Sequence, residues 1–196
     1  MRTALIFLFI IVYAIMGFAQ NEQTHNVPKK LSFDIGIQNL YKVNNLDSVA
    51  RFGYSATFDY AYQLSGFTGK RATYLTIPIG YSYLPSANAS EKTITMLRYG
   101  WTVRHEMSVG KKITPFLGYS LLLTQLKKAG IAGGIMGHQT KFEFGFDFNQ
   151  FGRNKPYIKV EYNYTRFPRW NEKKSYHFQL WEVKVGYRIS KKAKIK

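Results

Sequence analysis

Hydrophobic and polar residues alternate one by one along most of this chain. The stretch 141–148 reads KFEFGFDF, in which every second residue is phenylalanine and the residues between are lysine, glutamate, glycine and aspartate. In a β-strand this period of two places the four phenylalanines on one face and the charges on the other. The two faces therefore need different surroundings, one apolar and one polar.

Eight alternating segments of this kind follow one another and predict an all-β protein. Each is close to the roughly 9–11 residues that a tilted membrane-crossing strand needs. The predicted strands are 31–41, 51–62, 72–84, 93–107, 113–125, one containing 141–148, 156–165 and 176–189. Pro78 falls inside the third, and because proline cannot donate a ladder hydrogen bond, it predicts a bulge or another irregularity there. The pattern indicates an eight-stranded antiparallel transmembrane up-and-down β-barrel.

The alternation alone leaves open which face lies inside the barrel. A membrane barrel turns its apolar face to lipid, whereas a soluble lipocalin-like carrier turns it inward around a hydrophobic ligand. The polar face carries seven strand glycines: Gly36, Gly53, Gly80, Gly100, Gly118, Gly145 and Gly186. Since an eight-stranded barrel is only just wide enough for its inward side chains, long charged chains there need small neighbours. This favours a polar lumen, and the soluble carrier stays as an alternative.

The charges on the polar face balance. The basic residues are Arg51, Arg98, Arg104, Lys141, Lys159, Lys184 and Arg188, and the acidic ones are Asp34, Asp59, Glu106, Glu143, Asp147, Glu161 and Glu182. An unpaired buried charge costs several kcal/mol. We therefore predict that these residues pair in a network that fills the lumen and leaves no open pore.

The N-terminus has the features of a signal peptide. Arg2 precedes the apolar run 4–15, and the small residues Gly17 and Ala19 follow it. We expect a signal peptide at 1–19, a polar leader at 20–30, the barrel at 31–189 and a basic tail at 190–196. The chain has no cysteine, which excludes disulfides and a lipidated N-terminal cysteine.

With these features the chain resembles the small outer-membrane β-barrel family, of the OmpX and OmpA transmembrane-domain type. The resemblance rests on the signal peptide, the eight alternating segments, the charged polar-face positions and a last strand that reads WEVKVGYRI. It implies a place in the outer membrane of a Gram-negative bacterium and insertion by the barrel-assembly machinery. The family commonly ends on an aromatic residue, whereas this chain continues with SKKAKIK.

The formal net charge is +17, from 28 Lys and Arg against 11 Asp and Glu. Because the polar-face charges cancel, the excess must lie in turns and ends, mostly on the periplasmic side, where Lys29, Lys30 and the tail lysines fall. A basic rim there would attract anionic lipid headgroups, at about 1 kcal/mol per residue. The alternative is an acidic periplasmic protein bound by the tail. Nucleic acid is a poor candidate as a partner despite the basic charge, because export and the barrel topology keep the basic residues away from it.

Two external loops are candidate contact surfaces. The loop 126–137 is rich in glycine with exposed apolar residues, and the loop 166–175 mixes cations with aromatic rings. Its candidate binding residues are Arg166, Phe167, Arg169, Trp170, Lys173 and Lys174. Such a mixture suits the phosphates of lipopolysaccharide or a partner protein. We therefore expect a non-enzymatic structural or surface-interaction protein that acts through its external loops.

Catalytic chemistry has little support in the sequence. Some small outer-membrane barrels modify lipid A with a histidine and a serine, and here His105 with Ser108 and His177 with Ser175 are the candidates. Neither spacing matches a catalytic triad. Four histidines without cysteine make a metal site improbable. We predict no catalytic residue, metal or cofactor, with a lipid A-modifying enzyme as the alternative.

Overall fold

The computed structural model describes residues 29–44, 52–66, 71–86, 93–107, 109, 112–128, 134–151, 154–168 and 175–191. The elements are β1 (Lys29–Asn44), β2 (Phe52–Ser65), β3 (Arg71–Leu84), β4 (Ile94–Met107), β5 (Ile113–Lys128), β6 (Ile135–Phe148), the short 3-10 helix η1 (Asn149–Phe151), β7 (Asn154–Phe167) and β8 (Tyr176–Lys191). No helix in these ranges is long and apolar enough to cross a membrane.

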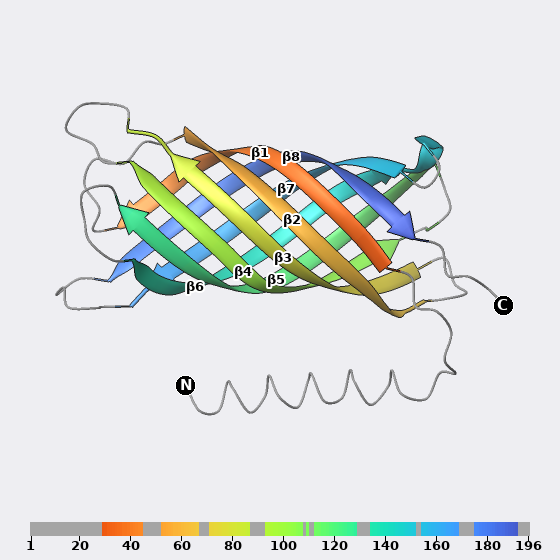
Figure 1. Ribbon diagram of the computed structural model, residues 1–196, viewed down its shortest axis with the longest axis horizontal. Coiled ribbons are helices and arrows are strands. Elements are labelled where there is room, and N and C mark those ends of the chain that lie inside the picture. The colour runs from red at the N-terminus through yellow and green to blue at the C-terminus, as the bar shows by residue number, and fades with distance from the viewer. Residues whose placement is uncertain are drawn as a thin grey trace.

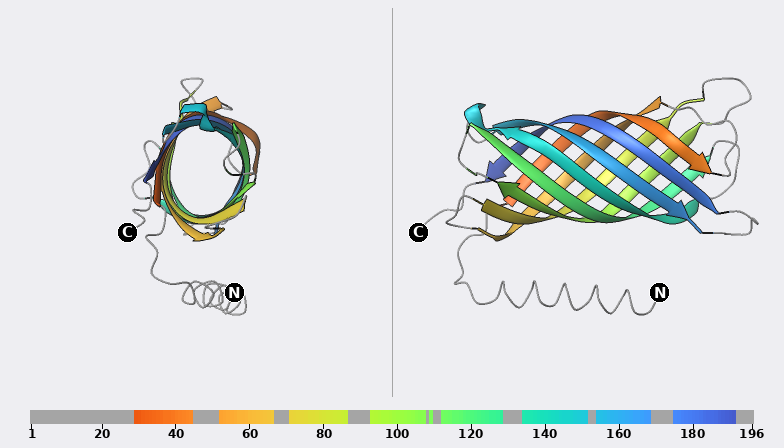
Figure 2. Two further views of the ribbon diagram at one scale, coloured as in Figure 1. Left: turned by 90° about the vertical axis from the view of Figure 1, so that its right-hand side faces the viewer. Right: turned by 180° about the vertical axis from the view of Figure 1, so that it is seen from behind.

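The strands form one closed antiparallel barrel. Each strand pairs with the next in sequence, and β8 pairs with β1 to complete the ring (Figure 2). The start of β1 and the end of β8 lie at the same end of the barrel (Figure 1). We call this the periplasmic end and the opposite one the external end. The predicted fold is confirmed.

The strands are staggered around the barrel. Following the paired residues from Lys29 across every strand in turn leads back to β1 at Asn39, ten residues beyond the start. Such a stagger requires strands that tilt relative to the barrel axis. The strands have 14 to 16 residues, more than the roughly 9–11 needed to cross a membrane, so their ends extend past the apolar band.

The apolar face is on the outside, as the glycine pattern predicts. The side chains of Phe33, Ile35 and Val183 are 53%, 54% and 51% exposed, whereas those of Asp34 and Glu182 are fully buried. A soluble carrier would need the reverse arrangement, with an apolar cavity inside. The lipocalin-like alternative is therefore wrong.

Pro78 interrupts the sheet on one side only. It pairs with Asp59 of β2, but the β3–β4 ladder has no pair between Thr76–Thr102 and Ile79–Tyr99. The register is the same on both sides of this gap, so the predicted irregularity is a break and not a bulge. Register shifts occur instead near strand ends, between Leu40 and Lys42 and between Gln63 and Ser65.

Lumen glycines make room for large side chains of the neighbouring strand. Gly145 pairs with Phe116, and a Cβ atom on Gly145 would lie 2.4 Å from Cζ of that ring. Gly186 pairs with Tyr157 and would meet its ring at the same distance. The rings thus lie directly over the glycines, which pins the register of these strand pairs.

Candidate functional site

Fourteen charged residues are buried inside the barrel, seven of each sign. Thirteen belong to the predicted set: Asp34, Asp59, Arg98, Arg104, Glu106, Lys141, Glu143, Asp147, Lys159, Glu161, Glu182, Lys184 and Arg188. The remaining predicted residue, Arg51, lies outside the described residues. Lys30 is the seventh buried base instead. We predicted that Lys30 lies on the periplasmic rim. That prediction was wrong, because β1 begins at Lys29 and the alternation turns Lys30 inward.

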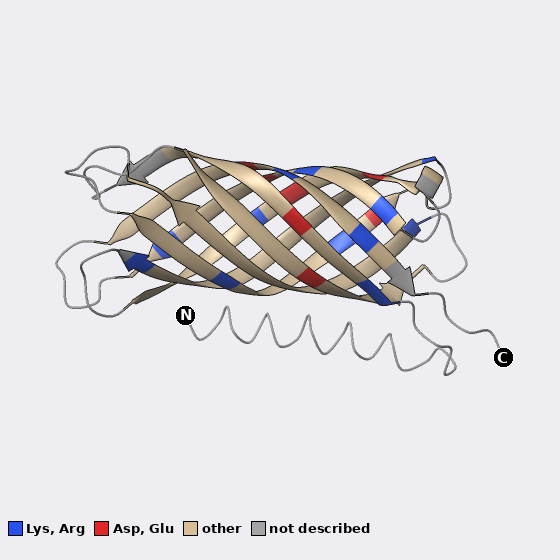
Figure 3. Ribbon diagram, turned by 45° about the horizontal axis from the view of Figure 1, so that its top comes forward, with Lys and Arg blue, Asp and Glu red and all other residues tan. Residues whose placement is uncertain are grey.

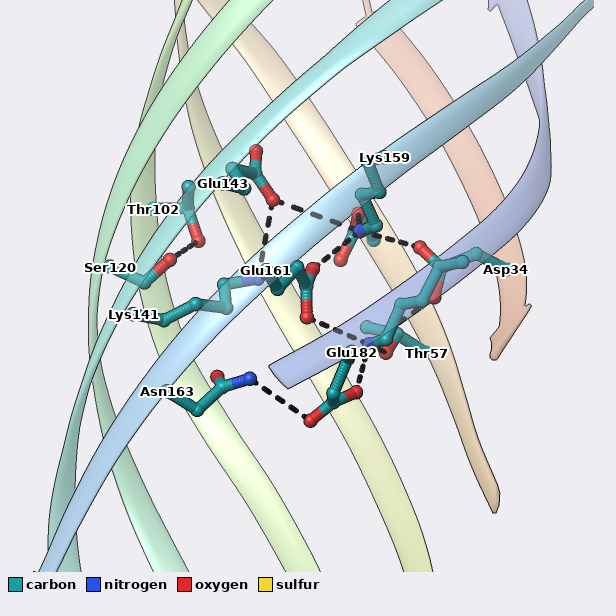
Figure 4. A network of polar contacts seen from close by, with 12 residues as sticks. Asp34, Thr57, Thr102, Ser120, Lys141, Glu143, Lys159, Glu161, Asn163 and Glu182 are labelled. Atoms are coloured by element: carbon teal, nitrogen blue, oxygen red, sulfur yellow. Dashed lines mark hydrogen bonds and ion pairs between the residues drawn. The ribbon is translucent and has the colours of Figure 1, made fainter. Parts of the chain in front are cut away.

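The centre of the lumen is a network in which acids and bases share partners (Figure 4). Lys159 Nζ lies 2.6 Å from Asp34 Oδ2 and 2.9 Å from Glu161 Oε1. Glu161 also contacts Lys141 at 3.1 Å and Lys184 at 3.0 Å. Each of these charges is therefore balanced by more than one neighbour, as burial in a low-dielectric interior requires.

Charged residues are spread along the barrel (Figure 3), and their ion pairs extend from the centre in both directions. On the external side, Glu182 pairs with Arg98 and accepts a hydrogen bond from Ser55 Oγ at 2.8 Å. On the periplasmic side, Glu106 lies 2.6 Å from Lys30 and 3.1 Å from Arg188. The guanidinium of Arg188 also pairs with an aspartate and stacks over aromatic rings: Asp147, Phe116 and Tyr157.

An apolar cluster closes the lumen at its external end. We call it the apolar seal, and its buried members are Leu40, Leu84, Ile94, Met96, Leu126, Phe167, Phe178 and Leu180. The rings of Phe167 and Phe178 pack edge to face with centroids 5.5 Å apart. We did not predict this seal. It could have been found by extending the inward alternation to the strand ends, where the inward residues change from polar to apolar.

The seal corrects one predicted binding residue. Phe167, expected in an external loop, is fully buried, because β7 extends to this residue and the alternation along the strand turns its side chain inward. Arg166, the residue before it, is exposed on the outer wall. The other predicted residues of this loop, Arg169, Trp170, Lys173 and Lys174, lie outside the described residues.

The lumen interior is packed. A cavity between Arg98, Lys141 and Glu161 has a volume of only about 10 Å³. This is close to the minimum that holds one water molecule. Side chains of the charge network therefore fill the lumen around these three residues.

The exposed charges of the described residues are all cations. The seven acidic residues in the described ranges are all buried in the lumen. Lys29, Arg71 and Lys112 are exposed at the periplasmic end, and Lys127 and Arg166 at the external end. Because the seven lumen acids cancel the seven lumen bases, the whole formal charge of +17 belongs to the rest of the chain.

One of the two predicted serine–histidine pairs is brought together. Ser175 Oγ lies 3.4 Å from His177 Nε2, and Tyr164 Oη lies 2.9 Å from His177 Nδ1. His105 Nδ1 instead contacts Thr73 Oγ1 at 3.1 Å, and Ser108 lies outside the described residues. A tyrosine can orient the imidazole, but it lacks the negative charge with which a carboxylate stabilises an imidazolium.

The described ranges hold no group of three or more His, Cys, Asp and Glu residues that could bind a metal ion. The structure therefore combines a filled lumen with an apolar outer wall that carries exposed cations at both ends.

Two solved structures share this architecture. Neisserial surface protein A has a TM-score of 0.58 at 13% identity, over 83% of this chain and 96% of that one. The outer membrane protein OprG from Pseudomonas aeruginosa has a TM-score of 0.54 at 10% identity, over 86% and 98%. The fold is that of the small outer-membrane β-barrels. Neither a protein-family model nor a curated protein sequence matches the chain.

Proposed function

We propose that this chain is an outer-membrane β-barrel of a Gram-negative bacterium that acts without catalysis, as a structural or surface-interaction protein through its external loops. The observation that carries the proposal is the closed lumen, in which a charge network lies below the apolar seal. Since buried side chains fill this interior, we expect other molecules to meet the protein on its outer wall and at its ends.

The outer wall supports the membrane location. It combines an apolar band with cations at both ends, and a cation near an anionic headgroup surface contributes about 1 kcal/mol. Insertion by the barrel-assembly machinery and contact with lipopolysaccharide are part of this proposal. A protein partner for the tail 190–196 is a further part, tested by comparing co-purified proteins with and without 192–196.

The role of the loops is tested by shortening them in cells. Residues 129–134 and 169–174 are each replaced by an Asn-Gly turn, which leaves every described strand residue in place. The control shortens the periplasmic turn 67–70 in the same way. If the loops act, cells with the loop variant behave like cells without the protein in detergent sensitivity and in adhesion, whereas the control behaves like wild type. Full function of the loop variant would contradict an interaction role.

A second candidate is a lipid A-modifying enzyme, which the contacts of His177 with Ser175 and Tyr164 favour. In such an enzyme the Ser175 oxygen would attack an acyl ester while its proton passes to His177 Nε2. The ester C–O bond would break, the lipid hydroxyl would leave with that proton, and water would then hydrolyse the acyl-serine to release the fatty acid and restore the serine. Mass spectra of lipid A from cells with wild type, His177→Ala and the control His105→Ala decide the question. A wild-type change in acylation that only His177→Ala abolishes supports the enzyme, and identical spectra exclude it.

A further inference from the structure

An apolar groove lies on the outer wall across β4 to β8. Its volume is about 770 Å³, within the range of small-molecule sites. We call it the wall groove and define it by Val103, Tyr119, Phe142, Val160, Tyr162 and Trp181. Two ring pairs form its sides, with centroids 5.0 Å apart in Tyr119–Phe142 and 4.9 Å apart in Tyr162–Trp181.

A row of nitrogen bases lies beyond the external end of this groove. His138 of β6 pairs with Arg166 of β7, and Arg166 pairs with His177 of β8. We call these three residues the cation row, after the permanently charged Arg166 at its centre. Each faces outward, because its neighbours in sequence Gln139, Thr165 and Phe178 are buried in the lumen.

Strand β7 connects the two features. Its successive outward residues Tyr162, Tyr164 and Arg166 lead from the wall groove through an aromatic ring to the cation row. Tyr164 also contacts His177 through its hydroxyl group, at 2.9 Å. An apolar slot and a charged group thus follow one another along the barrel wall, as the acyl chain and the headgroup do in a lipid.

The chemistry of the row selects an anion. Arginine presents a planar fork that binds phosphate through two parallel hydrogen bonds. No described carboxylate lies on the outer wall to neutralise it, since all seven described acidic residues are buried in the lumen. A phosphate at the border of the apolar band would therefore meet uncompensated positive charge.

We propose that the wall groove and the cation row bind one phosphorylated glycolipid of the lipid A type from the outer leaflet. An acyl chain lies in the groove, and a phosphate is held by Arg166 with His138 beside it. The row stands at the external end, which selects a lipid of the outer leaflet. The inference rests on the outer-membrane location and the lipopolysaccharide contact proposed above, and it assigns that contact to strand residues and not to the loops.

Binding is measured by native mass spectrometry of the full barrel in detergent, titrated with lipid A or with phosphatidylglycerol. The double variant His138→Gln/Arg166→Gln should weaken lipid A binding about tenfold or more, because it removes the guanidinium fork of Arg166 and the imidazole beside it. The control Arg71→Gln changes an exposed arginine at the opposite end and should bind like wild type.

The groove is tested separately by Val160→Phe, which fills it, against Ile77→Phe on another part of the wall. Weaker lipid A binding by Val160→Phe alone supports the proposal. Arg166→Lys keeps the positive charge but loses the guanidinium fork, so it should weaken lipid A binding by an intermediate amount. It replaces the double variant in the test if the double variant does not fold. Heat-dependent gel mobility shows which variants are folded.

Three results would overturn the proposal: wild type that retains no lipid A, unchanged lipid A binding in the folded Arg166 variants, or equally tight binding of phosphatidylglycerol. The last would assign the phosphate to a phosphoglycerolipid. The loop-shortened barrel keeps the whole site and should still bind lipid A. Failure of the loop-based function is therefore distinguishable from failure of this site.

Discussion

Replacing Lys159 by methionine is a direct test of the charge network. The lysine is fully buried, and its Nζ atom contacts Asp34 at 2.6 Å and Glu161 at 2.9 Å. Methionine has a similar length but no charge, so the variant leaves seven acids with six bases in the lumen. We expect a large loss of stability without a change of fold.

The expected loss follows from the contacts. With an effective dielectric constant of about 20, each of the two contacts gives a gross attraction of about 6 kcal/mol. Most of this attraction is offset by the cost of dehydrating the charges, so the intact pairs add little net stability. Removing only the lysine leaves the carboxylates dehydrated without their partner, which typically costs about 3–5 kcal/mol.

The free energy of unfolding is measured by urea titration of the barrel in lipid vesicles, followed by tryptophan fluorescence. The control Arg71→Met removes an exposed cation and, in vesicles of zwitterionic lipid, should change the free energy by no more than about 0.5 kcal/mol. The double variant Lys159→Met/Asp34→Asn restores the balance, and its loss should fall below the sum of the single losses by about 0.5–3 kcal/mol. A loss below about 1 kcal/mol in Lys159→Met would refute the view that these charges are dry and mutually dependent.

Three further substitutions test other parts of the barrel. Gly145→Ala should lower the urea midpoint by the equivalent of about 1–3 kcal/mol, because its Cβ would lie 2.4 Å from the Phe116 ring. At Gly80 the nearest atom would be 3.3 Å away, so the control Gly80→Ala should be nearly neutral, and equal effects of the two variants would contradict the packing argument. Phe178→Ala in the apolar seal should lower the free energy of unfolding by about 3–5 kcal/mol in the same titration. The variant should give no conductance in planar bilayers, because the charge network still closes the lumen, and steady ion channels would show that the seal alone blocks it. Phe144→Lys at mid-wall should lower the free energy of unfolding in lipid vesicles by about 2–4 kcal/mol, and Phe148→Lys at the periplasmic end of the wall by only about 0–1 kcal/mol. The difference follows from the depth of each residue in the bilayer, so equal losses would argue against a lipid-facing wall.

Much of the architecture can be predicted from the alternation of neighbouring residues along the chain. A period of two fixes which residues share a face, so the chain predicts eight strands, their polarity and the balance of the inward charges. The position of the glycines decides the direction of the faces, because a crowded lumen needs small residues such as Gly145 and Gly186. The strand ends were less well predicted, and this error placed Lys30 and Phe167 outside the lumen. Both follow the alternation once the strands are extended.

What the sequence could not supply is which residues meet across the barrel. Lys30 and Glu106 are 76 residues apart, and Ser55 and Glu182 are 127 apart, yet each pair makes a hydrogen bond. Their meeting depends on the register of every strand pair between them and on the ten-residue stagger with which the ring closes. The wall groove and the cation row have the same origin. The sequence by itself determined the two faces of each strand, and only the closed tertiary structure decided the neighbours, because closure joins strands that are distant along the chain.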